Sequence, residues 1–94
     1  MHYFLKLIAS RPTFAFDMTA EERETMNQHV AYWKQVMANG KVVVFGPVMD
    51  PAGPYGMGIV SANSQDEIQQ FMANDPASAI LRYEFHPMQA VLPS

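Results

Sequence analysis

Two helix-start signals divide this sequence and constrain its fold more than any other feature. Thr19 and Glu22 form a Thr-x-x-Glu capping box, and Ser64 and Glu67 form a similar Ser-x-x-Glu box. Each box is followed by apolar side chains at helical spacing, which are Met26, Val30, Trp33 and Met37 after the first and Ile68, Phe71 and Met72 after the second. The sequence therefore predicts two helices, the first ending at Gly40.

Four segments outside these helices have the branched and aromatic composition of β-strands. They are residues 3–9, 41–49, 57–62 and 83–92. Residues 10–18 and 50–56 contain Pro or Gly and are expected to be loops, and residues 77–81 are expected to form one further helical turn. Within 41–49, simple alternation predicts Val43 and Phe45 on one face and Val42 and Val44 on the other.

The resulting order, β-α-β-β-α-β, predicts a ferredoxin-like α+β fold with both helices on one face of a four-stranded antiparallel sheet. The 94 residues show no linker or repeat, so we expect one domain, 1–94. The first strand is apolar on both faces, since Phe4 and Ile8 lie opposite Tyr3, Leu5 and Leu7. The helices cover one face only, so we expect a homodimer packed through the open sheet faces.

Composition excludes or disfavours several classes of protein. The absence of cysteine excludes disulfides and thiolate chemistry, and a net charge of −3 without a basic block gives nucleic-acid binding no support. No apolar run approaches the roughly 18 residues of a membrane span, and the first residues lack a basic n-region. We expect a soluble, cytoplasmic chain that contacts no membrane. His2 and His86 can approach each other but lack a third ligand, so no metal or cofactor is expected.

The topology places several chemically interesting segments at one edge of the sheet. His29 lies ten residues after Thr19, about 15 Å along the first helix, on the flank of its apolar stripe. Asp75, at the end of the shorter second helix, is expected at a similar height. The sequence thus predicts a His29–Asp75 pair beside a cavity whose other candidate binding residues are Phe14, Phe16, Gly46, Pro47 and Tyr55.

Such a pair has a definite chemistry, and each member also has a structural interpretation. The carboxylate fixes the imidazole tautomer and leaves the other ring nitrogen for general acid–base catalysis. Alternatively, His29 is a satisfied structural residue, and Asp75 before Pro76 is a helix N-cap. Arg11 and Arg82 can meet an anionic substrate or be solvated surface charges.

Three segments carry a resemblance to a known family: "HVAYWKQVMANGKVVVFGPV", "NDPASA" and "YEFHPM". Their helical His, helix-ending Gly, Gly-Pro turn, Asp-Pro and Glu-x-x-Pro resemble the YciI-like (YCII-related) family. In this chain these positions are His29, Gly40, Gly46-Pro47, Asp75-Pro76 and Glu84 with Pro87.

The resemblance implies a dimeric ferredoxin-like α+β barrel in which His29 and Asp75 are the active-site pair. It also implies chemistry on small ring compounds, such as dehydrochlorination or isomerisation, without a redox cofactor. Ala77 departs from the pattern, because the family often has a large aromatic residue there, and this change can widen the pocket.

Three functional hypotheses follow. The first is a small cofactor-independent lyase or isomerase in which His29 moves a proton and Asp75 orients His29. The second is a non-catalytic dimeric module that binds a small molecule or supports an assembly, with His29 packed or hydrogen-bonded to backbone and no open cavity beside it. The third is that the pair is vestigial.

Overall fold

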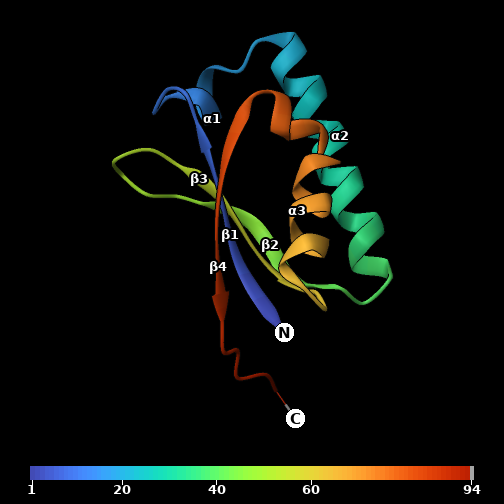
Figure 1. The fold of residues 1–94 in the computed structure, drawn as a ribbon. Coiled ribbons are helices and arrows are strands. Elements are labelled where there is room, and N and C mark those ends of the chain that lie inside the picture. Colours follow the sequence, from blue (N-terminus) through green and yellow to red (C-terminus); the bar gives the residue numbers. More distant parts are fainter. Residues whose placement is uncertain (94) are drawn as a thin grey trace.

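The structure, a computed structural model, describes residues 1–93. Along the chain it contains β1 (His2–Ala9), α1 (Phe14–Asp17), α2 (Ala20–Ala38), β2 (Val42–Val48), β3 (Tyr55–Ser61), α3 (Gln65–Ala73), the 3-10 helix η1 (Pro76–Ala79) and β4 (Leu81–Met88). Within this part of the chain the strands form one antiparallel sheet in the order β2-β3-β1-β4. Helices α2 and α3 cover one face of that sheet (Figure 1). The predicted ferredoxin-like α+β fold is confirmed.

The core lies between the sheet and these two helices. Tyr3, Leu5 and Leu7 share one face of β1, as the sequence predicted, and the structure shows that this is the face buried under the helices. They meet Trp33 from α2 and Ile68 from α3, both of which are fully buried. The apolar stripes of strand and helices therefore bury one another, which is the main source of stability for a domain of this size.

Local signals set the ends of α2 as predicted. The Thr19 side chain accepts a hydrogen bond from the Glu22 amide, and the Glu22 carboxylate accepts one from the Thr19 amide. At the other end Gly40 has a positive φ of 81°, which glycine adopts without a steric penalty. Its amide donates to the Met37 carbonyl and closes the last turn.

The second capping box is only half formed. Ser64 accepts from the Glu67 amide as expected, at 3.2 Å. The Glu67 carboxylate, however, accepts from the Asn63 amide and from Lys41, 3.1 Å away, instead of from the Ser64 amide. Because the Glu67 carboxylate binds Lys41, at the end of the α2–β2 connection, and the Asn63 amide, it does not bind the Ser64 amide.

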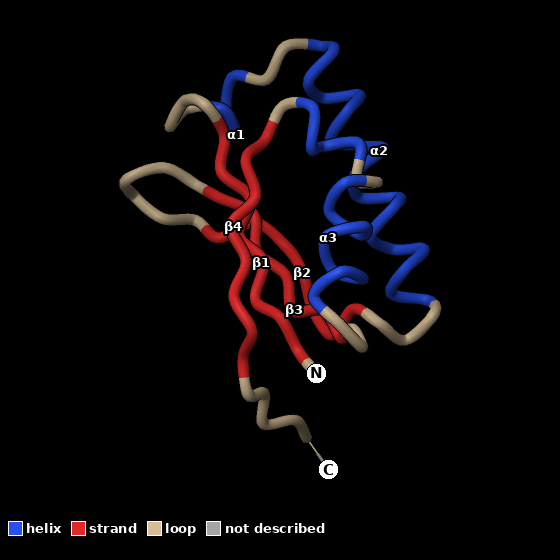
Figure 2. The backbone as a smooth tube through the Cα atoms, viewed as in Figure 1, coloured by secondary structure: helices blue, strands red, loops and turns tan. Residues whose placement is uncertain are grey.

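One short helix was not predicted, and the bounds of three further elements differ from the prediction. The segment 10–18 contains the short helix α1, in which Thr13 Oγ1 donates to Asp17 Oδ2 at 2.6 Å. β3 begins two residues early, and β4 spans Leu81–Met88 instead of 83–92. The predicted further turn is η1, shifted by one residue to begin at Pro76. Figure 2 shows α1 and the loop between β2 and β3 on the side where β4 begins.

The alternation predicted for β2 is wrong. A bulge between Val42 and Val44 shifts the register against β3, so that Val42 pairs with Val60 and Phe45 with Gly58. Val42 and Phe45 consequently share the helix-facing side, whereas Val44 is 49% exposed on the opposite face. One extra residue in a bulged strand moves every later side chain to the other face.

Among residues 1–93, no helix has both the length and the apolar character that crossing a membrane requires.

Candidate active site

Asp75 connects α3 to the last strand and is buried, with 1% of its surface exposed. It is the N-cap of η1, where its Oδ1 accepts from the Ala77 amide at 2.9 Å, and Pro76 follows at the first helical position. The capping interpretation of Asp75 is therefore correct. It uses only part of the carboxylate, whose remaining acceptor positions face α2 and β4.

His29 meets this carboxylate from α2. Its Nδ1 lies 2.8 Å from Asp75 Oδ2 and 3.0 Å from Oδ1. Because an ionised carboxylate only accepts hydrogen bonds, Nδ1 carries a hydrogen, and in the neutral form of the ring Nε2 is then the nitrogen with the lone pair. The structure thus brings together two residues that are 46 positions apart, and the catalytic role of the pair stays a prediction.

Two further side chains complete the surroundings of Asp75 and were missed by the sequence analysis. The Trp33 indole donates to Asp75 Oδ2 at 2.8 Å, and the Tyr83 hydroxyl donates to the same oxygen. Trp33 follows His29 by four residues, so both project from one face of α2. Buried indole and phenol groups need a polar partner, and that requirement was the available signal.

The charge state of this cluster follows from its contacts. Burial by itself raises the pKa of Asp75, but the hydrogen bonds from His29, Tyr83, Ala77 and Trp33 outweigh it and hold that pKa below its usual range. Burial, together with the adjacent carboxylate, raises the pKa of Tyr83 well above its ordinary value, so Tyr83 remains a donor. The cluster is an ionised carboxylate surrounded by donors.

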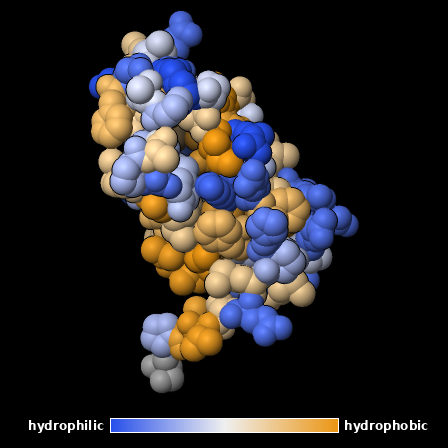
Figure 3. Space-filling model, turned by 90° about the vertical axis from the view of Figure 1, so that its left-hand side faces the viewer, coloured by the Kyte–Doolittle hydropathy of each residue, from blue (hydrophilic) through white to orange (hydrophobic). Residues whose placement is uncertain are grey.

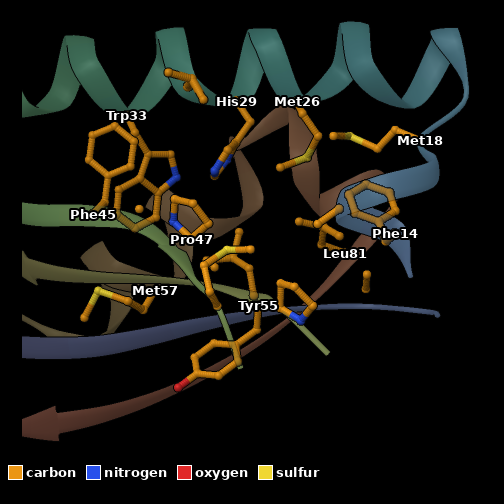
Figure 4. A pocket seen from close by; sticks show the side chains of 18 of the residues that line it. Phe14, Met18, Met26, His29, Trp33, Phe45, Pro47, Tyr55, Met57 and Leu81 are labelled. Carbon is orange, nitrogen blue, oxygen red and sulfur yellow. The ribbon is translucent and has the colours of Figure 1, made fainter. Parts of the chain in front are cut away.

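A cavity of about 380 Å³ opens beside His29. Its wall includes the five candidate binding residues named from the sequence, which are Phe14, Phe16, Gly46, Pro47 and Tyr55. In Figure 4 the His29 ring descends from α2 towards the cavity, with Trp33 and Phe45 to one side and Phe14, Met18 and Met26 to the other.

The predicted lining residues contribute in different ways. Phe14 is buried, whereas Phe16 is 72% exposed at the rim. Tyr55 was expected to help bind a ligand, and it lies in the wall, but its hydroxyl points away from the cavity (Figure 4), and the Lys6 ammonium lies 4.4 Å from the ring centre. This arrangement follows from the register of β3, in which Gly56 rather than Tyr55 faces the helices beside Leu7.

The remaining charged candidates are engaged elsewhere. Arg11 pairs with Asp17 at 2.8 Å and with Glu22 at 2.7 Å. The bond from Arg11 to Glu22, together with the capping bond from the Thr19 amide, lowers the pKa of Glu22 to about 2. Arg82 pairs with Glu84 at 2.7 Å.

The two other histidines lie on neighbouring strands. His86 pairs with Phe4, two residues along β1 from His2. In the described part of the chain no three His, Asp or Glu side chains are grouped as a metal site would require.

Comparison with known proteins finds similar solved structures and a matching family. One of these structures is 5-chloro-2-hydroxyhydroquinone dehydrochlorinase from Burkholderia phenoliruptrix, in complex with 2,5-dihydroxybenzoquinone; it is 22% identical, has a TM-score of 0.66, and the alignment covers 93% of both chains. At this identity the likeness shows the fold. No curated protein matched. Residues 2–86 match the YCII-related domain, which is nearly the whole chain, and the protein therefore belongs to the YCII-related family.

Proposed function

We propose that this protein is a small cofactor-independent enzyme of the lyase or isomerase type, in which His29 transfers a proton. One observation carries the proposal: His29 presents one ring nitrogen to a buried carboxylate while its ring lines an apolar cavity. A family whose fold also serves a dehydrochlorinase gives further support.

The arrangement suits His29 to act as a general base. Asp75 holds Nδ1–H, which leaves the Nε2 lone pair available to a ligand in the cavity. Nε2 would remove a proton from a ring hydroxyl, whose oxygen keeps the electron pair, or from a carbon next to a carbonyl, in which case the electron pair of the C–H bond would pass to the carbonyl oxygen. The imidazolium formed is stabilised by Asp75, which stays ionised.

Two outcomes complete the proton balance. In an isomerisation, the imidazolium returns its proton to a different carbon of the same enolate. In an elimination, the enolate electrons expel a leaving group from the adjacent carbon, and the imidazolium later gives its proton to water. Both need one titratable group, held in one tautomer, in a cavity that excludes most water.

The first test is turnover of a panel of hydroxylated and halogenated quinols, lactones and keto acids. Replacing His29 with Asn keeps a polar side chain of similar reach but removes the base, so we expect a loss of about 10²–10⁴-fold for any substrate turned over. Gln28→Ala, at an exposed neighbouring position on α2, is the control. Circular dichroism confirms that both variants fold. Turnover by His29→Asn at the native rate would refute the catalytic role.

The binding-module hypothesis predicts a packed His29 with no cavity beside it. The cavity of about 380 Å³ beside His29 disagrees with this prediction. A vestigial site makes a different prediction in the same experiment: compounds bind in the cavity, but none is converted by native protein.

A further inference from the structure

The wall of the cavity is uncharged. Of the residues that line it within 1–93, none is Asp, Glu, Lys or Arg, and His29 is the titratable side chain that faces inward. The Arg11 guanidinium lies over the ring of the lining residue Phe14, 5.2 Å from its centre. Its N–H groups, however, donate to Asp17 and Glu22. The cavity therefore has no fixed cation to receive a carboxylate or phosphate group.

The charge behind the wall points the same way. Asp75 is ionised and buried directly behind His29, and its negative charge is already matched by the donors around it. If an anionic ligand bound next to a protonated His29, the imidazolium would be its only cationic neighbour, and Asp75 already pairs with that imidazolium on the other side of the ring. A second anion in this apolar space would be desolvated without a cation of its own, which is strongly unfavourable.

The uncharged wall is suited to rings. Phe14, Trp33 and Phe45 supply aromatic surface, and Met18 and Met26 supply flexible, polarisable side chains that adapt to ring edges. A cavity of about 150 Å³ already accepts benzene. The volume of about 380 Å³ found here leaves room for a substituted ring or for two fused rings.

Resting on the function proposed above, we infer that the ligand is an uncharged, substituted or fused-ring compound that presents one acidic O–H or C–H edge to His29 Nε2. The site discriminates against analogues that carry a carboxylate or phosphate. Substrate choice is thus exerted by exclusion of charge rather than by an ion pair.

A matched pair of probes tests this inference by binding alone. At pH 7, 2-naphthol is neutral, whereas 6-hydroxy-2-naphthoic acid carries an ionised carboxylate on the same ring system. Titrations followed by ¹H–¹⁵N NMR should show 2-naphthol shifting the Trp33 indole and cavity-wall signals. We expect the acid to bind at least about tenfold more weakly, because its charge is desolvated without a partner. Equal or tighter binding of the acid, or no binding of 2-naphthol, overturns the inference.

A charge-inserting variant provides the converse test. Met49 lines the cavity and is 61% exposed, so Met49→Lys places an ammonium group at the rim without disturbing the core. Relative to the neutral control Met49→Gln, we expect Met49→Lys to shift the binding ratio several-fold towards the acid. An unchanged ratio overturns the inference.

These outcomes are separate from the fate of the proposed function. Neutral-ring selectivity in a protein that turns nothing over refutes catalysis and leaves this inference intact. Turnover that depends on His29 but is fastest for carboxylated rings supports the proposed catalysis and refutes this inference.

Discussion

At the scale of single residues, Asp75 unites the two interpretations that the sequence left open. Its Oδ1 caps η1 through the Ala77 amide, and the same carboxylate holds His29 Nδ1. The sequence could predict the cap, because Asp-Pro is a local signal, and could place His29 nearby from helix length and topology. It could not predict Tyr83, because that contact depends on how far β4 is displaced along β1.

The Tyr83 hydroxyl gives a residue-scale prediction. Tyr83→Phe removes one hydrogen bond to a buried carboxylate while keeping the ring, so we expect the free energy of unfolding at pH 7 to fall by about 2 kcal/mol. The pKa of Asp75 is depressed in the folded state, so its stabilisation is present above the ordinary value of 3.8 and is lost as pH falls through the lower folded value. The difference between native protein and variant should therefore shrink below about pH 4.

Urea denaturation at a series of pH values measures this difference. Tyr55→Phe, at the cavity rim and outside the Asp75 cluster, is the control and should stay within about 0.5 kcal/mol of native protein. A Tyr83→Phe effect that stays constant down to the lowest pH at which both proteins remain folded would show that Tyr83 acts through packing and not through the carboxylate.

At the scale of elements, local signals were predictable and tertiary ones were not. The capping box at Thr19 and the end of α2 at Gly40 depend on residues within one turn of each other, and both formed as predicted. At Ser64 the reciprocal bond of the capping box did not form, because the Glu67 carboxylate binds Lys41, which lies 26 residues earlier in the chain. The β2 bulge depends on the pairing of β2 with β3. The residues around Ser64 and within β2 carry no local signal for the Lys41 contact or for the bulge.

The contact between α2 and β3 gives an element-scale prediction. A Cβ at Gly58 would overlap the ring of Trp33, which is fully buried and bonded to Asp75. Gly58→Ala must displace either the strand or the ring, so we expect about 1–3 kcal/mol of destabilisation. The Trp33 indole N–H signal should also shift, because its bond to Asp75 is disturbed.

Gly46→Ala is the matched control, since a Cβ there meets nothing within 4 Å. Its free energy of unfolding should be unchanged or slightly higher, because alanine restricts the unfolded chain. Equal stability of the two variants would mean that the α2–β3 packing yields to an added methyl group.

At the scale of the whole molecule, no layer formed by residues 1–93 covers the second face of the sheet. Phe4 and Ile8 of β1 and Ile59 of β3 point away from the helices, and the β2 bulge adds Val44 to this face. Figure 3 views the molecule from this side and shows apolar side chains, in orange, between polar ones, in blue. Sheets with apolar residues on both faces are normally covered on both.

We therefore propose that two chains pack through this face, as the sequence analysis expected. Native protein at micromolar concentration should sediment with a mass near twice the 10.6 kDa of one chain. Ile59→Glu buries an unpaired charge near the middle of the proposed interface, so we expect it to sediment as a single chain. Phe16→Glu adds the same charge at the exposed cavity rim and should remain dimeric. Native protein that sediments as one chain, or dimerisation that survives Ile59→Glu but not Phe16→Glu, would place the interface elsewhere. In the second case the cavity rim itself would be the contact surface, and each site would be shared between two chains.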